Sequence, residues 1–338
     1  MKRNLPYAAL LALVLCACAK APTPGLNDSA KLFFDAWIHV YYPDAVASPM
    51  GTYLLSETAG SGTAAGSSEA NPFVRVNYTV YDLGGTVQST SREDVAQRTG
   101  DYKEENYYGP EVWSRGEGQL SAGLDDALVQ MRTGGKRTVA VPGWLNTSSR
   151  YASPEEYIAN VSGTDTIFEV ELLDVIPDVK KWETDSLARY ITRAFPGKSA
   201  SDTLKYGFYY VRGAAPSSEK DFPVDTTIYI NYVGRLLDGH VFDTNVKDSA
   251  KFYGLYSASR TYAPTAVTWY NSEGTYTDIK MGGSTVIDGF AYALSKMHPH
   301  EKGTAVFYSG VGYGSNGSGS SIPGFSPLRF DIEIVDKP

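Results

Sequence analysis

Cysteine and positive charge are both scarce in this chain of 338 residues, and each shortage excludes a class of protein. The 2 cysteines, Cys16 and Cys18, lie close to the N-terminus, so no disulfide framework holds the rest of the chain together. Only 20% of the residues are charged, and the formal net charge is −8. A surface that binds nucleic acid needs clustered Lys and Arg, so nucleic acid is excluded as a partner.

Tyrosine and glycine are abundant instead, with 25 and 33 residues. This composition favours strands joined by tight turns over a helical bundle. A chain of this length exceeds one typical hydrophobic core and predicts about two domains.

The N-terminus reads as a short export signal. Two positive residues precede the apolar run Ala8–Leu15, which is too short to span a membrane. The run ends in Leu15-Cys16-Ala17-Cys18, which resembles a bacterial lipobox, where the chain is cut before a cysteine that receives lipid. Cys18 fits better than Cys16 because the small residue Ala17 precedes it. The alternative is an ordinary secretory signal with two incidental cysteines.

The lipobox resemblance implies a signal peptide over residues 1–17 and a tether over residues 18–27, with lipid on Cys18 holding the protein to a membrane. Ala19 follows that cysteine where an Asp is absent, which resembles lipoproteins sent to the outer membrane. We therefore expect a protein of the bacterial cell envelope, anchored in the outer membrane and facing the periplasm.

One pattern occurs twice in the chain. Ile228–Thr244 reads as a strand, a turn with Asp-Gly and a return strand, and Val74–Thr90 repeats it. A short helix follows each hairpin, at Gly123–Met131 and Gly289–Met297, and an alternating strand closes each copy. A repeat this long indicates two whole domains. The predicted fold class is α+β, with two domains that are each a curved antiparallel sheet wrapped on one short helix.

We expect the domains to occupy residues 28–177 and 200–338. A helix over residues 178–199 connects them and either packs on one domain or acts as a stiff spacer; its wide apolar face favours packing. Ser91–Trp113, which is polar and rich in turns, and the longer Val246–Thr275 are predicted insertions.

Ahead of the first hairpin, a helix is predicted from Asn27 or Asp28 to about Tyr42. It carries an apolar stripe of the kind that surface helices turn toward a core. The stripe consists of Leu32, Phe33, Ala36, Trp37 and Val40.

The order of motifs in the second copy resembles the FKBP-type peptidyl-prolyl cis-trans isomerases. In chain order the motifs are Tyr232, Asp238-Gly239, Val241-Phe242-Asp243, Val286-Ile287-Asp288-Gly289-Phe290, Met297, Tyr313-Gly314, Ile322-Pro323 and Phe330–Glu333. No single fragment is specific, but their occurrence together in the family's order is. The resemblance covers most of residues 200–338 and, more weakly, residues 50–176.

This resemblance implies an active cleft in the second domain. Its catalytic residues would be Tyr232, Phe242, Asp243, Ile287, Phe290, Tyr313 and Phe330, and its substrate-binding residues Val286 and Ile322. The family usually has Trp where this chain has Phe290, and phenylalanine still offers a flat aromatic floor.

The chemistry that the family performs needs no nucleophile, metal or cofactor. A dry aromatic pocket that grips a prolyl ring favours the twisted amide, which is less polar than the planar one. By resemblance, the Tyr313 hydroxyl and the backbone N–H of Ile287 would donate to substrate carbonyls, and Asp243 would orient Tyr232.

The first copy departs from the family at the same positions. Val87 and Gln88 are expected where the aromatic ring and the carboxylate stand in the second copy, and Leu124 replaces the aromatic floor. Tyr78 and Phe168 remain. We therefore interpret the first domain as FKBP-like in fold and inactive.

The expected function is a peptidyl-prolyl cis-trans isomerase that assists the folding of exported proteins and acts on proline-containing polypeptide clients. The alternatives are a non-catalytic chaperone or binding lipoprotein on FKBP-like domains, and a glycan-binding surface lipoprotein suggested by the many tyrosines. The presence of both Asp243 and Tyr313 favours the isomerase, because a binding protein has no need of that pair.

Overall fold

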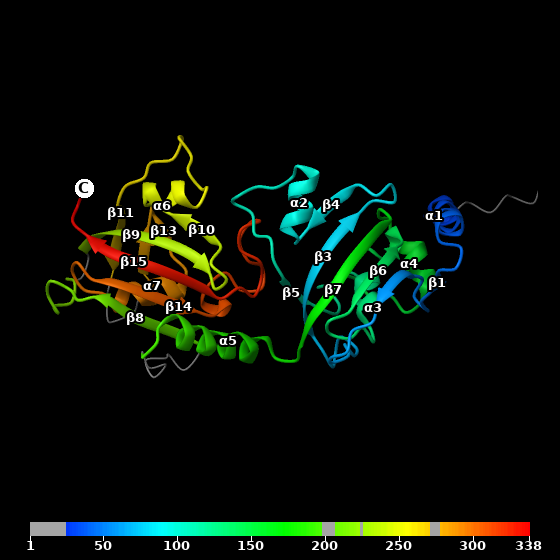
Figure 1. Ribbon diagram of the computed structural model, residues 1–338, viewed down its shortest axis with the longest axis horizontal. Coiled ribbons are helices and arrows are strands. Elements are labelled where there is room, and N and C mark those ends of the chain that lie inside the picture. Colours follow the sequence, from blue (N-terminus) through cyan, green and yellow to red (C-terminus); the bar gives the residue numbers. More distant parts are fainter. Residues whose placement is uncertain (1–24, 198–206, 224–225, 271–277) are drawn as a thin grey trace, which may run out of the picture.

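The protein has two antiparallel sheets at opposite ends of an elongated molecule (Figure 1). The computed structural model describes residues 25–197, 207–223, 226–270 and 278–338, so the predicted signal peptide and most of the tether lie outside the described residues. Helices are few and short beside the sheets. The predicted α+β class with two similar sheet domains is confirmed.

The two sheets follow the same path. The first runs β1 (Val46–Ala47), β2 (Tyr53–Thr58), β6 (Lys136–Val141), β7 (Thr166–Ile176), β3 (Phe73–Tyr81) and β4 (Val87–Thr90), with β5 (Glu111–Ser114) also paired to β3. The second runs β13 (Ser284–Thr285), β12 (Asp278–Met281), β11 (Thr265–Tyr270), β9 (Thr226–Leu236), β15 (Leu328–Val335), β14 (Lys302–Phe307) and β8 (Phe208–Ala214), with β10 (Val241–Thr244) on β9. The order β2-β6-β7-β3 of the first domain thus matches β8-β14-β15-β9 of the second.

Both predicted insertions contribute a strand to a sheet, which corrects part of the sequence interpretation. Glu111–Ser114, at the end of the first predicted insertion, pairs with β3, and Thr265–Tyr270, in the second, pairs with β9. Such short strands carry too few alternating residues to be recognised beside polar loops.

One short helix packs on each sheet, α3 (Ala122–Leu128) in the first domain and α7 (Asp288–Ser295) in the second. Leu124 and Leu128 of α3 and Phe290 and Leu294 of α7 are buried in the cores of their domains. A further helix follows each hairpin, α2 (Glu93–Thr99) and α6 (Lys247–Phe252). The remaining small elements are α4 (Pro154–Asn160), which the sequence analysis did not predict, and the 3-10 helices η1 (Gly143–Leu145) and η3 (Ser309–Val311).

The N-terminal helix α1 (Asp28–Tyr41) buries the opposite side from the one that its apolar stripe indicates. Phe34 and Ile38 are its buried residues, and Phe34 packs edge-on against Tyr53 and Trp144, with ring centroids 5.8 and 5.9 Å apart. The predicted stripe lies mainly in solvent, with Leu32, Phe33 and Val40 among the exposed apolar residues. The helix is apolar on more than one side, so periodicity alone did not decide which side packs.

The connecting helix α5 (Val179–Ala194) packs on the second domain and is not a free spacer. Its buried residues Leu187 and Ile191 form a cluster with Tyr209 of β8 and Val306 of β14. The first domain also contacts the second directly. The backbone N–H of Tyr107 donates to the Ser320 carbonyl at 2.8 Å.

Candidate functional site

A β-bulge in the second hairpin brings two neighbouring side chains to one cavity. Val241 pairs with Arg235 and Asp243 with Gly234, so Phe242 is an extra residue in β10. Neighbours in a regular strand point to opposite faces, and a bulge re-aims them. As a result, both Phe242 and Asp243 line the same cavity.

The cavity has a volume of about 250 Å³ and is lined by eight of the nine residues that the resemblance assigned to a cleft. These eight are Tyr232, Phe242, Asp243, Val286, Ile287, Phe290, Tyr313 and Phe330. Ile322 is not part of the lining, and its side chain is 3% exposed in the core of the domain. Met281, Ser284 and Thr285 complete the lining and were not singled out in the sequence.

The floor of the cavity is aromatic. The rings of Phe290 and Phe330 meet edge to face with centroids 4.8 Å apart, and Phe242 meets Phe330 at 5.6 Å. This packing depends on Gly234, because a Cβ there would lie 2.5 Å from the Phe242 ring and 2.8 Å from the Phe330 ring. Aromatic pairs of this geometry give a rigid apolar surface with little room to rearrange.

The polar wall of the cavity is the Asp243 carboxylate, which forms a hydrogen bond with a tyrosine and an ion pair with an arginine. The Tyr232 hydroxyl donates to Oδ2 of Asp243 at 2.6 Å, and the Arg260 guanidinium donates to Oδ1 at 2.7 Å. Both carboxylate oxygens are therefore engaged. Burial, followed by the charge of Asp243, raises the pKa of Tyr232, so the phenol stays protonated. Sequence reasoning missed Arg260, which lies in the loop between α6 and β11 and has no characteristic spacing from Asp243.

Two donors on the rim are available to a ligand. Within the described residues, neither the Tyr313 hydroxyl nor the Ile287 backbone N–H has a hydrogen-bond partner. Ile287 is the N-cap residue of α7, where the amide dipoles of the helix favour a carbonyl oxygen. Burial, followed by the charge of Asp243, raises the pKa of Tyr313, which keeps its hydroxyl a donor.

The connecting helix holds the loop that carries Tyr313. The backbone N–H and the hydroxyl of Ser309 both donate to the Glu183 carboxylate, each at 2.7 Å. The Ser309 carbonyl in turn accepts from the N–H groups of Gly312 and Gly314, each at 2.8 Å, on either side of Tyr313. Burial of Glu183 raises its pKa to about 7, against the opposing effect of the two Ser309 bonds. The helical pattern of α5 gave no sign of this contact.

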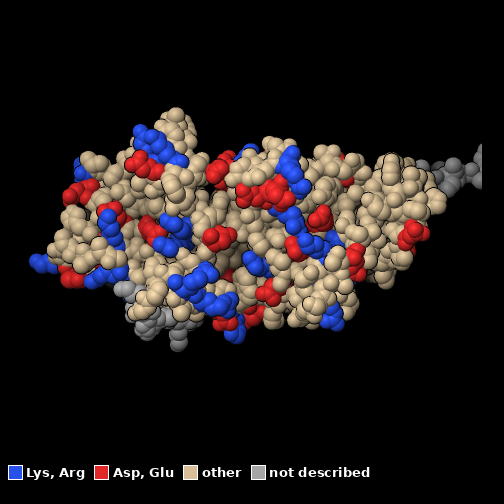
Figure 2. All heavy atoms as spheres, viewed as in Figure 1, with Lys and Arg blue, Asp and Glu red and all other residues tan. Residues whose placement is uncertain are grey.

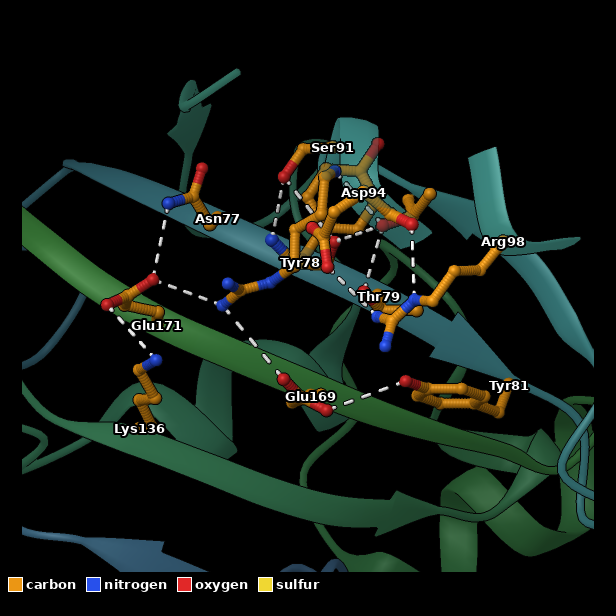
Figure 3. Close-up of polar contacts among 12 residues, drawn as sticks. Asn77, Tyr78, Thr79, Tyr81, Ser91, Asp94, Arg98, Lys136, Glu169 and Glu171 are labelled. Atoms are coloured by element: carbon orange, nitrogen blue, oxygen red, sulfur yellow. Dashed lines mark hydrogen bonds and ion pairs between the residues drawn. The ribbon is translucent and has the colours of Figure 1, made fainter. Parts of the chain in front are cut away.

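In both domains, the backbone of the tyrosine on the central strand forms the same pair of hydrogen bonds with polar side chains. The Tyr78 N–H donates to the Ser91 hydroxyl at 2.9 Å (Figure 3), and the Tyr232 N–H donates to Oδ1 of Asn245 at 2.9 Å. A threonine hydroxyl before each of these partners donates to the carbonyl of the same tyrosine, from Thr90 at 3.1 Å and from its counterpart in the second domain at 2.7 Å. The scaffold under the tyrosine is therefore shared.

The side chains above that scaffold differ. The Tyr78 hydroxyl donates to Oε1 of Glu111 at 3.2 Å, and the Trp113 ring lies against the Tyr78 ring with centroids 5.1 Å apart. Trp113 pairs with Val74, four residues before the tyrosine. Val267 has the same place in the second domain, opposite Ile228.

The register corrects the predicted correspondence by one residue. Val87 pairs with Tyr81 as Val241 pairs with Arg235, so Gln88 and Ser89, rather than Val87 and Gln88, take the places of Phe242 and Asp243. The sequence comparison had matched Val87 to Phe242 because both are apolar, but strand pairing matches Val87 to Val241.

Val80 of the first domain stands where the second has Gly234. Val80 faces Phe168 across the ladder, and Gly234 faces Phe330. A valine in that place fills the space that the Phe242 ring occupies in the second domain. The return strand of the first domain therefore carries neither an aromatic ring nor a carboxylate at these places, and the carboxylate that accepts from its tyrosine is Glu111 of β5 instead.

Among the described residues, no group of three or more His, Cys, Asp and Glu could hold a metal ion. The nearest approach to such a group is the buried Glu301, which accepts from Tyr210 at 2.5 Å and Arg212 at 3.1 Å and contacts His298 at 3.1 Å. These partners satisfy the carboxylate with protein groups, as a structural network does.

A family model for the FKBP-type peptidyl-prolyl cis-trans isomerase matches two segments, residues 65–173 and 219–335. Peptidyl-prolyl cis-trans isomerase FKBP9 of Bos taurus is 25% identical over 223 residues, which is 65% of this chain and 29% of that protein. The chain thus spans less than a third of the length of that relative.

Two other similar proteins are smaller. FK506-binding protein 2 of Dictyostelium discoideum is 28% identical over 139 residues, covering 41% of this chain and 84% of that protein. The crystal structure of a peptidyl-prolyl cis-trans isomerase from Pseudomonas syringae is 26% identical, covers 47% of this chain and 92% of that chain, and gives a TM-score of 0.31.

Proposed function

We propose that this chain, which belongs to the FKBP-type peptidyl-prolyl cis-trans isomerase family, isomerises X–Pro bonds in the cavity of its second domain. The observation that carries the proposal is that an aromatic floor, Tyr232 and Asp243 line one cavity of about 250 Å³, with Arg260 paired to Asp243. That volume accommodates a pyrrolidine ring with part of the preceding residue.

The barrier to be lowered is the loss of amide resonance, about 18–20 kcal/mol for rotation of a peptide bond. The twisted amide is less polar than the planar one. A pocket walled by Phe290, Phe330 and Phe242 therefore binds the twisted amide more tightly than the planar one, which lowers the barrier. Binding the prolyl ring on this floor leaves the preceding carbonyl free to rotate.

The rim donors would hold the flanking backbone. The Ile287 N–H and the Tyr313 hydroxyl have no partner within the described chain and would donate to two substrate carbonyls. Arg260 pairs with Asp243 beside the rotating bond, and Asp243 keeps Tyr232 fixed against the floor. No step in this account requires a nucleophile or a proton transfer.

The first domain is proposed to be non-catalytic. Trp113 and Val80 occupy the space above its tyrosine, and Ser89 replaces the carboxylate. Its role would be structural or in contacts with client polypeptides.

The test is a protease-coupled assay of the full mature chain with a short peptide containing one X–Pro bond. Asp243→Ala and Phe290→Ala should each lower kcat/KM by about tenfold or more, by loss of a charged hydrogen-bonding group or of the ring floor. Tyr78→Phe, in the first domain, is the matched control and should leave kcat/KM unchanged. A wild-type chain without measurable turnover would leave the non-catalytic binding protein as the better reading.

We further propose that the protein is an envelope lipoprotein attached through Cys18, with exported polypeptides as its clients. The order of a short apolar run and the Leu-Cys-Ala-Cys motif supports this assignment. Metabolic labelling with a radioactive fatty acid should mark the wild-type protein and Cys16→Ser, but not Cys18→Ser. Labelling of Cys18→Ser would refute the assignment.

A further inference from the structure

Helix α1 has an apolar side that no described residue of the protein covers. Seen down its axis at about 3.6 residues per turn, α1 has three successive sectors. One is buried on the first domain through Phe34 and Ile38. The second is polar, with Asp28, Lys31, Asp35 and His39. The third is apolar and exposed, with Leu32, Phe33, Ala36 and Val40.

The exposure of this third sector is large. Leu32 is 72% exposed, Phe33 61% and Val40 68%, and Leu26, just before the helix, is 60% exposed. Together they make up much of the exposed large apolar surface of the described chain, gathered on one short helix. An exposed apolar patch of this kind indicates a site that contacts another protein or a membrane.

The position of α1 in the molecule favours a membrane as the partner of this sector. It lies at the end of the long axis, away from the second domain (Figure 1), and the visible face of that end carries few charged side chains (Figure 2). The described chain begins at Gly25, seven residues after Cys18. Seven residues reach at most about 25 Å, so a lipid on Cys18 would keep α1 next to the bilayer surface.

We propose that α1 lies on the membrane, with Leu32, Phe33 and Val40 in the boundary between headgroups and acyl chains. The helix has 14 residues and is about 21 Å long, which is too short to cross the hydrocarbon core. No helix of the described residues is long and apolar enough to do so. Trp37 is half-buried between the apolar sector and the first domain, and in this orientation it would lie near the interface, where aromatic residues are favoured.

The charges of α1 indicate how it would bind. Lys31 and Asp35 pair with each other at 2.5 Å, and the sector offers no cluster of basic residues to anionic lipid. Binding would therefore depend on apolar contact and only weakly on the charge of the headgroups or on salt. The bilayer would hold the first domain, and the second domain, with its cavity, would point away from the membrane toward clients (Figure 1). The proposal does not depend on isomerase activity.

The test uses a chain that begins at residue 19, which carries neither cysteine and keeps every described element of both domains. Flotation with vesicles of phosphatidylcholine, and of phosphatidylethanolamine with phosphatidylglycerol, measures partitioning without the lipid anchor. We expect binding to both kinds of vesicle, and a blue shift of tryptophan emission that Trp37→Phe removes.

The double variant Leu32→Glu with Phe33→Glu should partition roughly tenfold less or weaker still, because two apolar contacts become charged. The control is Phe252→Glu on α6, which replaces one exposed apolar side chain, 81% exposed in the second domain, by a carboxylate, and it should bind as the wild type does. Both variants should keep the wild-type unfolding midpoint.

Three results would overturn the proposal. They are a wild-type chain that does not float, a double variant that floats as well as the wild type, and a dimer in sedimentation that the double variant dissociates. The last would assign the apolar sector to a second copy of the chain.

Discussion

The two domains share one scaffold and differ in what stands on it. In both, a tyrosine on the central strand is held through its backbone by a Thr and a small polar residue that follow the hairpin. In the second domain, Gly234 leaves room for Phe242, and Asp243 binds the tyrosine hydroxyl. In the first, Val80 stands in place of Gly234, and the Trp113 ring lies against the Tyr78 ring. The comparison teaches that two copies of one fold can keep the same backbone support while the side chains around the tyrosine differ.

The largest effect is expected from moving one first-domain residue into the second domain. Gly234→Val would place side-chain atoms where the Phe242 ring lies, since even a Cβ there comes within 2.5 Å of it. The ring must leave the cavity wall, and kcat/KM should fall by about 100-fold. The proline-peptide assay measures this, and Val80→Gly is the reciprocal control that should leave turnover intact. Normal turnover by Gly234→Val would break the proposed difference between the domains.

The second largest effect on kcat/KM is expected from replacing the Asp243 carboxylate. Asp243→Ser installs the first-domain residue, leaves Arg260 and the Tyr232 hydroxyl without their acceptor, and should lower kcat/KM by about 10- to 50-fold. Much of the loss should appear in kcat, because the floor that binds the prolyl ring stays. An unchanged kcat with a raised KM would show that Asp243 only binds substrate.

A smaller, pH-dependent effect is expected at Glu183. Its folded-state pKa of about 7 lies above its ordinary value of 4.5, so its stabilising contribution is complete below about pH 4.5 and is lost as the pH rises through 7. The free energy of unfolding should therefore fall by about 2–3 kcal/mol between pH 5 and pH 8 through this group. Urea unfolding of Glu183→Gln at both pH values should show a smaller fall than the wild type. Equal falls would mean that Glu183 does not titrate in this range.

Glu183→Gln is also expected to affect the isomerase activity of the second domain. Glu183→Gln keeps one acceptor for Ser309 and loses the second, so the loop with Tyr313 should loosen and kcat/KM fall by a few fold. Glu183→Asp, which keeps the charge on a shorter side chain, should be intermediate. Wild-type activity in both variants would remove α5 from the account of the site.

The smallest effect on turnover is expected from the first domain. Trp113→Val copies Val267 of the second domain and uncovers the Tyr78 ring. We expect about 1–3 kcal/mol less stability, from lost aromatic packing, and no change in kcat/KM. Calorimetry and the peptide assay together measure both, and a gain of turnover would show that Trp113 alone had closed a working site.

Much of this organisation could be predicted from the sequence because it depends on local patterns. The two hairpins, the helices α3 and α7 and the closing strands carry clear periodicity, and the motif order led to the residues that line the cavity. Contacts between distant segments left no such signal. Arg260 approaches Asp243 from a loop, and Glu183 approaches Ser309 from a helix that looked like a connection.

The errors had physical causes of the same kind. Ile322 belongs to a motif but is not among the residues that line the cavity, so its substrate-binding role stays a prediction. The correspondence of Gln88 and Ser89 depends on strand register, which a bulge shifts by one residue. Helix α1 is apolar on two sides, and only the shape of the first domain decides that Phe34 packs.

The most direct measurement of the central claim is exchange NMR of a proline peptide with two full-length double variants. One combines Gly234→Val with Asp243→Ser, and the other combines Val80→Gly with Ser89→Asp. The account predicts that cis-trans exchange catalysed by the wild type disappears in the first variant and is retained in the second. Catalysed exchange that persists in the first variant would contradict a single working site in the second domain.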